Sequence, residues 1–131
     1  MRVFVDANTL VSGLVFSGPE HVFLKTARLR KFQLVTSEDV VDEVLAVLNR
    51  KFADKTPLAV EFFKLAGLEV ILRADYAKLV DPQKVRDEKD RHVLAAAIAS
   101  GCKVILTGDK DLLSIKTLRG ISIKTTKELL H

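Results

Sequence analysis

Short apolar runs alternate with longer segments of helical periodicity along the whole chain. Runs rich in β-branched residues predict strands at residues 2–5, 32–35, 68–72, 104–106 and 121–123. Apolar residues at helical spacing predict helices over residues 20–31, 38–50, 56–66, 87–100 and 109–114. Thr125 or Thr126 is expected to cap a further helix at the C-terminus.

The remaining segments carry weaker signals. Residues 7–13 follow Asp6 and break the strand pattern, so we expect a turn or loop there. Residues 76–80 are expected to form a short helical piece, which Asp81-Pro82 then interrupts because proline disfavours helix in the residue before it. Strands that alternate with helices favour parallel pairing with right-handed crossovers. The pattern therefore predicts a single domain over residues 1–131, built as a three-layer α/β/α sandwich around a mainly parallel sheet.

Composition narrows the class of protein. The chain is 48% hydrophobic, so one core is expected, and its longest apolar run, Val93 to Ala99, is seven residues, whereas a membrane span needs roughly twenty. The first apolar run stops at Asp6, which is not typical of a secretory signal. Cys102 is the only cysteine, so no internal disulfide is expected. We therefore predict a cytoplasmic protein without a membrane span.

Four acids stand where α/β proteins place their binding sites. Asp6 ends the first predicted strand and Asp109 closely follows the strand at 104–106, so both are expected at the edge where ligands bind. Asp90 continues the apolar stripe of its helix and is expected to face inward. Glu43 borders the stripe of the helix at 38–50, but Glu38 borders the opposite side nearly as well, and periodicity does not choose between them.

Ordinary structural roles compete with a functional one at each position. Asp87 and Asp90 in a first helical turn often serve capping and the helix dipole. Glu43 fits an exposed helix face, and Asp6 and Asp109 fit turns. The acids alone therefore leave the question open.

Four segments stand out together: VFVDANTLVS (3–12), SEDVVDE (37–43), RDEKD (86–90) with LAAA (94–97), and TGDKDLL (107–113). Their combination resembles the PIN domain, and within it the prokaryotic proteins described as toxin components of toxin-antitoxin systems. The resemblance covers essentially the whole chain. Each motif is weak alone, but the four occur in the family's order and spacing. One departure is Glu88, where relatives often carry proline.

The resemblance implies a site. It maps the family's acidic quartet onto Asp6, Glu43, Asp90 and Asp109, as catalytic residues and metal ligands, and so selects Glu43 over Glu38. Flanking residues are expected to support these acids: Asn8, Asp87, Thr107 and Asp111.

Chemistry accounts for such a set. Clustered carboxylates raise one another's pKa values unless a cation compensates them, and hard oxygen ligands favour Mg²⁺ or Mn²⁺. The expected reaction is attack of a metal-activated water on a phosphodiester, with Glu43 orienting or deprotonating the water. The resemblance implies an RNA substrate, cleaved to a 5′ phosphate and a 3′ hydroxyl.

The charge distribution is compatible with RNA. If four of the 17 acids are gathered in one pocket, 13 remain against 21 bases, an excess of eight. Lys89, Arg91, His92 and Lys110 lie beside the predicted ligands and are candidate contacts to the RNA backbone. The resemblance also implies a small antitoxin protein as partner, and a homodimer formed through apolar surface on the helices between residues 20 and 66.

Two other functions compete. Asp6, Asn8 and Thr9 resemble the nucleophile motif of haloacid dehalogenase-type phosphatases, but Asn8 replaces that motif's second aspartate. A non-catalytic PIN-like module that binds RNA or protein is the second alternative, although an intact acidic quartet argues against it. Such a module is expected to bind RNA equally with and without Mg²⁺.

Overall fold

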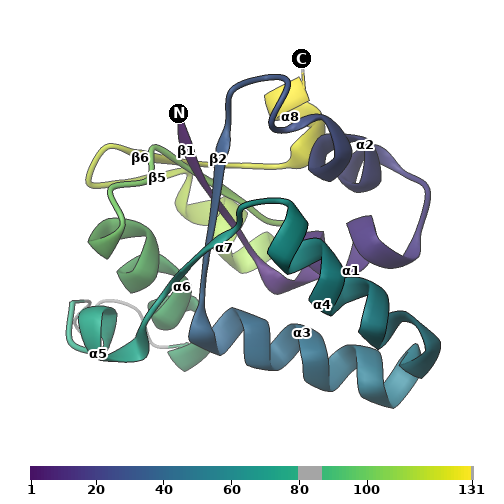
Figure 1. Ribbon diagram of the computed structural model, residues 1–131. Coiled ribbons are helices and arrows are strands. Elements are labelled where there is room, and N and C mark those ends of the chain that lie inside the picture. Colours follow the sequence, from purple (N-terminus) through teal and green to yellow (C-terminus); the bar gives the residue numbers. More distant parts are fainter. Residues whose placement is uncertain (80–86, 131) are drawn as a thin grey trace.

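A six-stranded sheet forms the centre of the computed structural model, which describes residues 1–79 and 87–130 (Figure 1). The strands are β1 (Arg2–Val5), β2 (Gln33–Ser37), β3 (Glu69–Ile71), β4 (Val104–Leu106), β5 (Thr117–Leu118) and β6 (Ile121–Lys124). Their order is β3-β2-β1-β4-β6-β5, and all neighbours are parallel except β5 and β6. The predicted mainly parallel sheet is confirmed.

Helices cover both faces of this sheet. They are α1 (Ala7–Val15), α2 (Pro19–Thr26), α3 (Glu38–Lys51), the 3₁₀ turn η1 (Ala53–Lys55), α4 (Thr56–Leu65), α5 (Arg73–Tyr76), α6 (Glu88–Ala99), α7 (Lys110–Ile115) and α8 (Thr126–Leu130). The helices α1 to α4 lie on one face, and α6 and α7 lie on the other (Figure 1). Right-handed crossovers require this division, because the chain moves outward from β1 to β3 and then returns across β1 to β4. The predicted α/β/α sandwich is therefore confirmed.

The central strands are buried from both sides. Val3, Phe4 and Val5 of β1 are fully buried, as is Ile105 of β4. Such runs are typical of a parallel sheet covered on both faces, and they hold the strand ends in fixed positions. Within the described residues, no helix has the length and apolarity required to cross a membrane.

The loop predicted at residues 7–13 is wrong, because this segment forms most of helix α1. The Asp6 carboxylate accepts a hydrogen bond from the Ala7 amide (2.7 Å) and serves as the N-cap of the helix. Ala7, Leu10 and Gly13 are buried on its inner face. Tertiary packing outweighed the turn-forming residues that the sequence presents here.

Two further boundaries differ from prediction. The helix expected over residues 20–31 ends at Thr26, and the chain turns through Lys31, which has a φ of 61°, with no glycine to mark the end. The strand β5 was not predicted, and it pairs with β6 through a turn with positive φ at both Arg119 and Gly120. Helix α5 ends at Tyr76, whereas part of the short helix expected over 76–80, and Asp81-Pro82, fall outside the described residues.

Gly13 sets the distance between α1 and α2. A Cβ atom at this position would lie 2.3 Å from Leu24 Cδ1 and 3.0 Å from the Glu20 carbonyl oxygen. We expect Gly13→Ala to lower the free energy of unfolding by about 1–3 kcal/mol through overpacking, reduced by the higher helix propensity of alanine. Thermal unfolding by circular dichroism is the measurement, with Gly108→Ala as control, since a Cβ there meets nothing within 4 Å. An unchanged melting temperature in Gly13→Ala would contradict the close packing.

Candidate active site

The site forms where the sheet reverses its strand order. β1 and β4 pair in parallel with Val5 opposite Leu106, so their carboxyl ends are adjacent. Asp6 follows β1 directly, and the Thr107 hydroxyl that follows β4 donates to Asp6 Oδ2 (2.8 Å). The same hydroxyl accepts from the Asp109 amide (3.0 Å). Thr107 therefore links the two acids that the sequence predicts at the ligand-binding edge of the sheet, and the structure places their strands side by side.

Asp6 is held inside the protein. Its side chain is 4% exposed, and its two carboxylate oxygens accept from the Ala7 amide and from Thr107. Burial raises the pKa of Asp6 above its ordinary value, although these two hydrogen bonds oppose the rise. The negative charge of Glu43 raises this pKa further and the positive charge of Lys89 lowers it.

Asp90 faces inward from the first turn of α6. Asp87 caps that helix by accepting from the Lys89 and Asp90 amides (2.9 and 3.3 Å), so Asp90 is not needed as a cap. Asp90 is 6% exposed. Among the described residues, its carboxylate accepts no hydrogen bond and forms no ion pair. Every completely buried side-chain oxygen in this part of the chain has a hydrogen-bond partner, so neither Asp90 oxygen is completely buried. The Asp90 oxygens therefore reach solvent from an otherwise buried residue.

The charge of Asp90 is poorly compensated. Burial, together with the like charges of neighbouring acids, raises its pKa to about 6. These neighbours are Asp87, Asp109, Asp111 and Asp6. Acids from three separate segments of the sequence thus act on one carboxylate.

Asp109 is the N-cap of helix α7. Its Oδ1 accepts from the Asp111 and Leu112 amides (2.8 and 3.4 Å) at the start of α7, which leaves Oδ2 without a hydrogen bond among the described residues. Asp109 is half-buried, whereas Asp111 is exposed. One oxygen of Asp109 is therefore free for a ligand while the other fixes the side chain.

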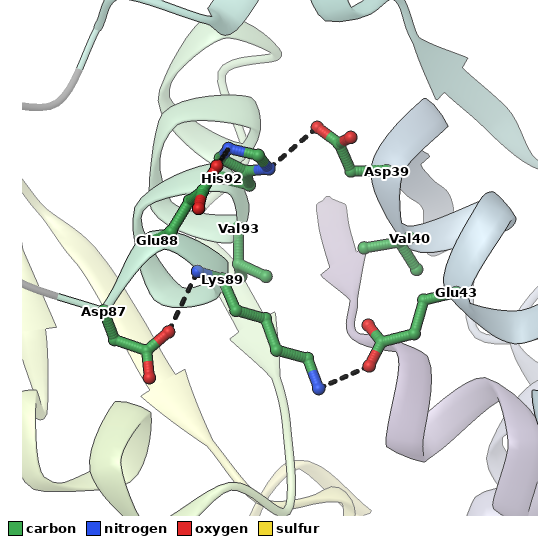
Figure 2. Close-up of a pocket in the computed structure, with 8 residues that line it drawn as sticks. All are labelled: Asp39, Val40, Glu43, Asp87, Glu88, Lys89, His92 and Val93. Atoms are coloured by element: carbon green, nitrogen blue, oxygen red, sulfur yellow. Dashed lines mark hydrogen bonds and ion pairs between the residues drawn. The ribbon is translucent and has the colours of Figure 1, made fainter.

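Glu43 reaches the site from α3 and forms an ion pair with the Lys89 ammonium of α6. Both residues line a pocket of about 490 Å³ between the two helices (Figure 2). The full lining is Asp39, Val40, Glu43, Asp87, Glu88, Lys89, His92 and Val93. Asp6, Asp90 and Asp109 do not line this pocket, so it adjoins the acidic strand ends at the Glu43–Lys89 pair.

A polar network that the sequence analysis missed clamps α3, α5 and α6 beside this pocket. The Asp39 carboxylate accepts hydrogen bonds from the Tyr76 hydroxyl and from Arg73 Nε (2.9 Å), and lies 3.0 Å from His92 Nδ1. Arg73 also donates its amide to Glu38 Oε1 (2.7 Å). These partners come from segments far apart in the sequence, and spacing within one helix carries no signal of them.

The network makes a prediction about stability. Although partial burial opposes it, the hydrogen bonds from Tyr76 and Arg73 and the charge of His92 hold the pKa of Asp39 below its ordinary value. Ionised Asp39 therefore stabilises the fold at neutral pH, and this contribution is lost as pH falls toward the lowered pKa. We expect Asp39→Asn to reduce the free energy of unfolding by roughly 1–3 kcal/mol at pH 7, and less at pH 3. Denaturant unfolding at both pH values is the measurement, and equal losses at both would contradict the charged role.

The remaining predicted residues lie around the acids. Asn8 is exposed on α1 and makes no hydrogen bond to Asp6 within the described residues. Lys110 is exposed at the start of α7, Arg91 is half-buried on α6, and His92 faces Asp39 rather than solvent alone. Of the predicted supporting residues, Thr107 is the one that bonds Asp6 directly.

The donor chemistry of the acids suits a hard divalent cation. Asp6, Asp90 and Asp109 offer carboxylate oxygens at one sheet edge, and the raised pKa of Asp90 marks uncompensated negative charge. Among residues 1–79 and 87–130, however, no three histidine, cysteine, aspartate or glutamate side chains are close enough together to form a ready-made metal site. The residues fit such an ion by their chemistry, and binding requires their side chains to converge.

Known proteins share this fold. A family model described as the PIN domain matches residues 2–111. Among solved structures, VapBC2 from Rickettsia felis, bound to a promoter DNA fragment, is similar with a TM-score of 0.68, 15% identity and coverage of 95% of this chain and 98% of that one. VapC20 from Mycobacterium tuberculosis, a toxin that cleaves the sarcin-ricin loop, is similar with a TM-score of 0.63 and 16% identity. The match covers 92% of this chain and 98% of that one. PAE2754 from Pyrobaculum aerophilum is similar with a TM-score of 0.66 and 19% identity, and the match covers 99% of this chain and 87% of that one.

At these identities the structural likeness shows the fold alone. None of the curated proteins matches the chain.

Proposed function

Because the chain belongs to the PIN domain family, we propose that it is an endoribonuclease that depends on Mg²⁺ or Mn²⁺ and hydrolyses RNA phosphodiester bonds. Asp6, Glu43, Asp90 and Asp109 form its catalytic and metal-binding quartet. The observation that carries the proposal is the Asp90 carboxylate. Asp90 is 6% exposed, its oxygens reach solvent without a partner among the described residues, and burial together with neighbouring acids, Asp109 and Asp6 among them, raises its pKa. Such a group is expensive to keep ionised without a cation.

The four acids have different proposed roles because they occupy different positions in the site. Asp6, Asp90 and Asp109, together with Glu43, would hold a divalent cation, which when bound would supply activation of water and stabilisation of negative charge at the phosphate. Thr107 fixes the orientation of Asp6, and the capped Oδ1 of Asp109 fixes that of its free Oδ2. Glu43 lines the adjoining pocket and orients or deprotonates the attacking water.

Two of the similar structures support a proposal about the biological setting. VapC20 is a toxin that cleaves the sarcin-ricin loop, and VapBC2 was solved bound to promoter DNA. We therefore propose that the chain, as a single PIN domain over residues 1–131, is the toxin of a toxin-antitoxin pair and acts in the cytoplasm on RNA. A small antitoxin protein would be its partner.

We also propose a homodimer. Exposed apolar side chains lie on and beside the helices α2 and α4, with Leu29 84% exposed and Leu65 67% exposed. Exposed apolar side chains on neighbouring helices are typical of a protein contact. Light scattering after size exclusion measures the mass, and a monomer at all concentrations would contradict a dimer.

The test is cleavage of a mixed pool of single-stranded and structured RNA by purified protein with Mn²⁺, with Mg²⁺ and with EDTA. Asp6→Asn, purified identically, excludes a contaminating nuclease. We expect cutting that needs the metal, is lost in the variant and leaves 5′ phosphates. Cutting that persists in EDTA or in Asp6→Asn would contradict the proposal.

A non-catalytic module is the second candidate, because the described residues contain no ready-made metal site and the Glu43 carboxylate is paired with the Lys89 ammonium. RNA binding that is equal with and without Mg²⁺, and no cutting, would favour it. Membership of the PIN family sets aside the haloacid dehalogenase interpretation of residues 6–9.

A further inference from the structure

Lys89 places a positive charge inside the acidic site. Its side chain extends from the first turn of α6 across to α3, where the ammonium meets the Glu43 carboxylate (Figure 2). The hydrogen bond to Glu43 raises the pKa of Lys89, and the charges of Asp6 and Asp109 raise it as well, while desolvation opposes the rise. The ammonium therefore interacts with three of the four site acids.

The pair is poised to separate. Lys89 is 56% exposed along its side chain and Glu43 28% exposed, so solvent screens their attraction and the lysine stem has room to move. A lysine ammonium is a compact point charge on a flexible stem, and it binds phosphate as readily as carboxylate. Glu43 is at the same time the quartet member on the pocket wall.

We propose that Lys89 is the resident counter-cation of the acidic site, which competes with the divalent metal for Glu43 and turns to a backbone phosphate of the RNA once the metal has bound. The inference rests on the proposed function. It gives one side chain two effects of opposite sign, because Lys89 weakens metal binding in the free protein and strengthens RNA binding in the loaded one. A lysine that only stabilises the fold would not produce this pair of effects.

The first measurement is Mn²⁺ affinity without RNA, from the electron paramagnetic resonance signal of free Mn²⁺. We expect Lys89→Met to lower the Kd for Mn²⁺ by about 2- to 5-fold, the range of an exposed ion pair, and Lys89→Arg to stay near wild type. Lys110→Met is the matched control, because Lys110 follows a site acid but forms no ion pair with the described residues. In a Glu43→Gln background, Lys89→Met is expected to lose most of its effect, and the charges of Asp6 and Asp109 account for the remainder.

The second measurement is cleavage at saturating Mn²⁺. We expect Lys89→Met to raise KM for RNA with little change in kcat, and to reduce the slope of log KM against log salt by roughly 0.7, the value of one phosphate contact on a single strand. Lys89→Arg is expected to restore both quantities. Melting curves of each variant verify that the fold is retained.

The outcomes distinguish a failure of the role proposed for Lys89 from a failure of the proposed nuclease function. Unchanged or weaker Mn²⁺ binding in Lys89→Met, or an equal effect of the substitution in Glu43→Gln, overturns the role of Lys89 while the nuclease stands. A wild-type protein that takes up no Mn²⁺ and cuts no RNA contradicts the proposed function and this inference with it.

Discussion

Replacing Asp90 with asparagine is expected to abolish RNA cleavage and to stabilise the metal-free protein at neutral pH. Asparagine retains the shape of the side chain but lacks the charge that a metal ion needs. Because the Asp90 carboxylate has no partner among the described residues, the amide loses no hydrogen bond. Asp6→Asn is also expected to abolish cleavage, but there an amide replaces an acceptor used by Thr107 or Ala7. Asp90 is therefore the cleaner position at which to separate activity from stability.

The stability change has a defined pH dependence. The folded protein binds the Asp90 proton more tightly than the unfolded chain does, since the pKa rises from 3.8 to about 6 on folding. Ionised Asp90 therefore lowers the free energy of unfolding progressively between about pH 4 and pH 6. We expect Asp90→Asn to be roughly 1–3 kcal/mol more stable than wild type at pH 7, with the difference disappearing near pH 4.

Two measurements verify this prediction. RNA cleavage with Mn²⁺ is expected to fall by at least about 100-fold, and thermal unfolding in EDTA from pH 4 to pH 8 follows the stability. Asp54→Asn, at an exposed aspartate of η1, changes the net charge equally and is expected to alter neither quantity. Wild-type cleavage by Asp90→Asn would refute the site, and a pH-independent stability difference would contradict the raised pKa.

The inward orientation of Asp90 could be predicted from the sequence because residues of the same helix determine it. Asp90 lies four residues before Leu94 and seven before Ala97, so helical spacing places the three on one side of α6, and the structure buries all three. The rule that ligands bind at the carboxyl ends of strands beside a switch in order predicts that Asp6 and Asp109 lie close together, provided that their strands are neighbours. Here β1 and β4 are direct neighbours.

Other features depend on contacts that no local pattern encodes. Residues 7–13 carry turn-forming residues, yet burial of Leu10 and the close approach of Leu24 to Gly13 favour a helix. The bonds from Tyr76 and Arg73 to Asp39 join α5 to α3, and the Lys89–Glu43 pair joins α6 to α3. Partners of this kind become visible only when the chain crossings are known, so the electrostatics of the site had to come from the structure.

The choice between Glu43 and Glu38 came from family resemblance, and a pair of substitutions tests it. Glu43 faces Lys89 in the pocket, whereas Glu38 Oε1 accepts the Arg73 amide at the opposite edge of α3. We expect Glu43→Gln to lower kcat for RNA cleavage by about 10²- to 10⁴-fold, the usual range for a general base. Glu38→Gln keeps a carbonyl oxygen for the Arg73 amide and is expected to stay within about twofold of wild type, since a single hydrogen bond is preserved.

Both substitutions remove one negative charge from the same helix, so they form a matched pair for any general effect of charge on RNA binding. The measurement is the single-turnover cleavage rate at saturating Mn²⁺ and saturating protein, which isolates the chemical step from RNA affinity. Loss of activity in Glu38→Gln with a normal rate in Glu43→Gln would move the catalytic role to the other side of α3. Normal rates in both would leave the water to be activated by the aspartates at the strand ends alone, because neither glutamate would then act on it.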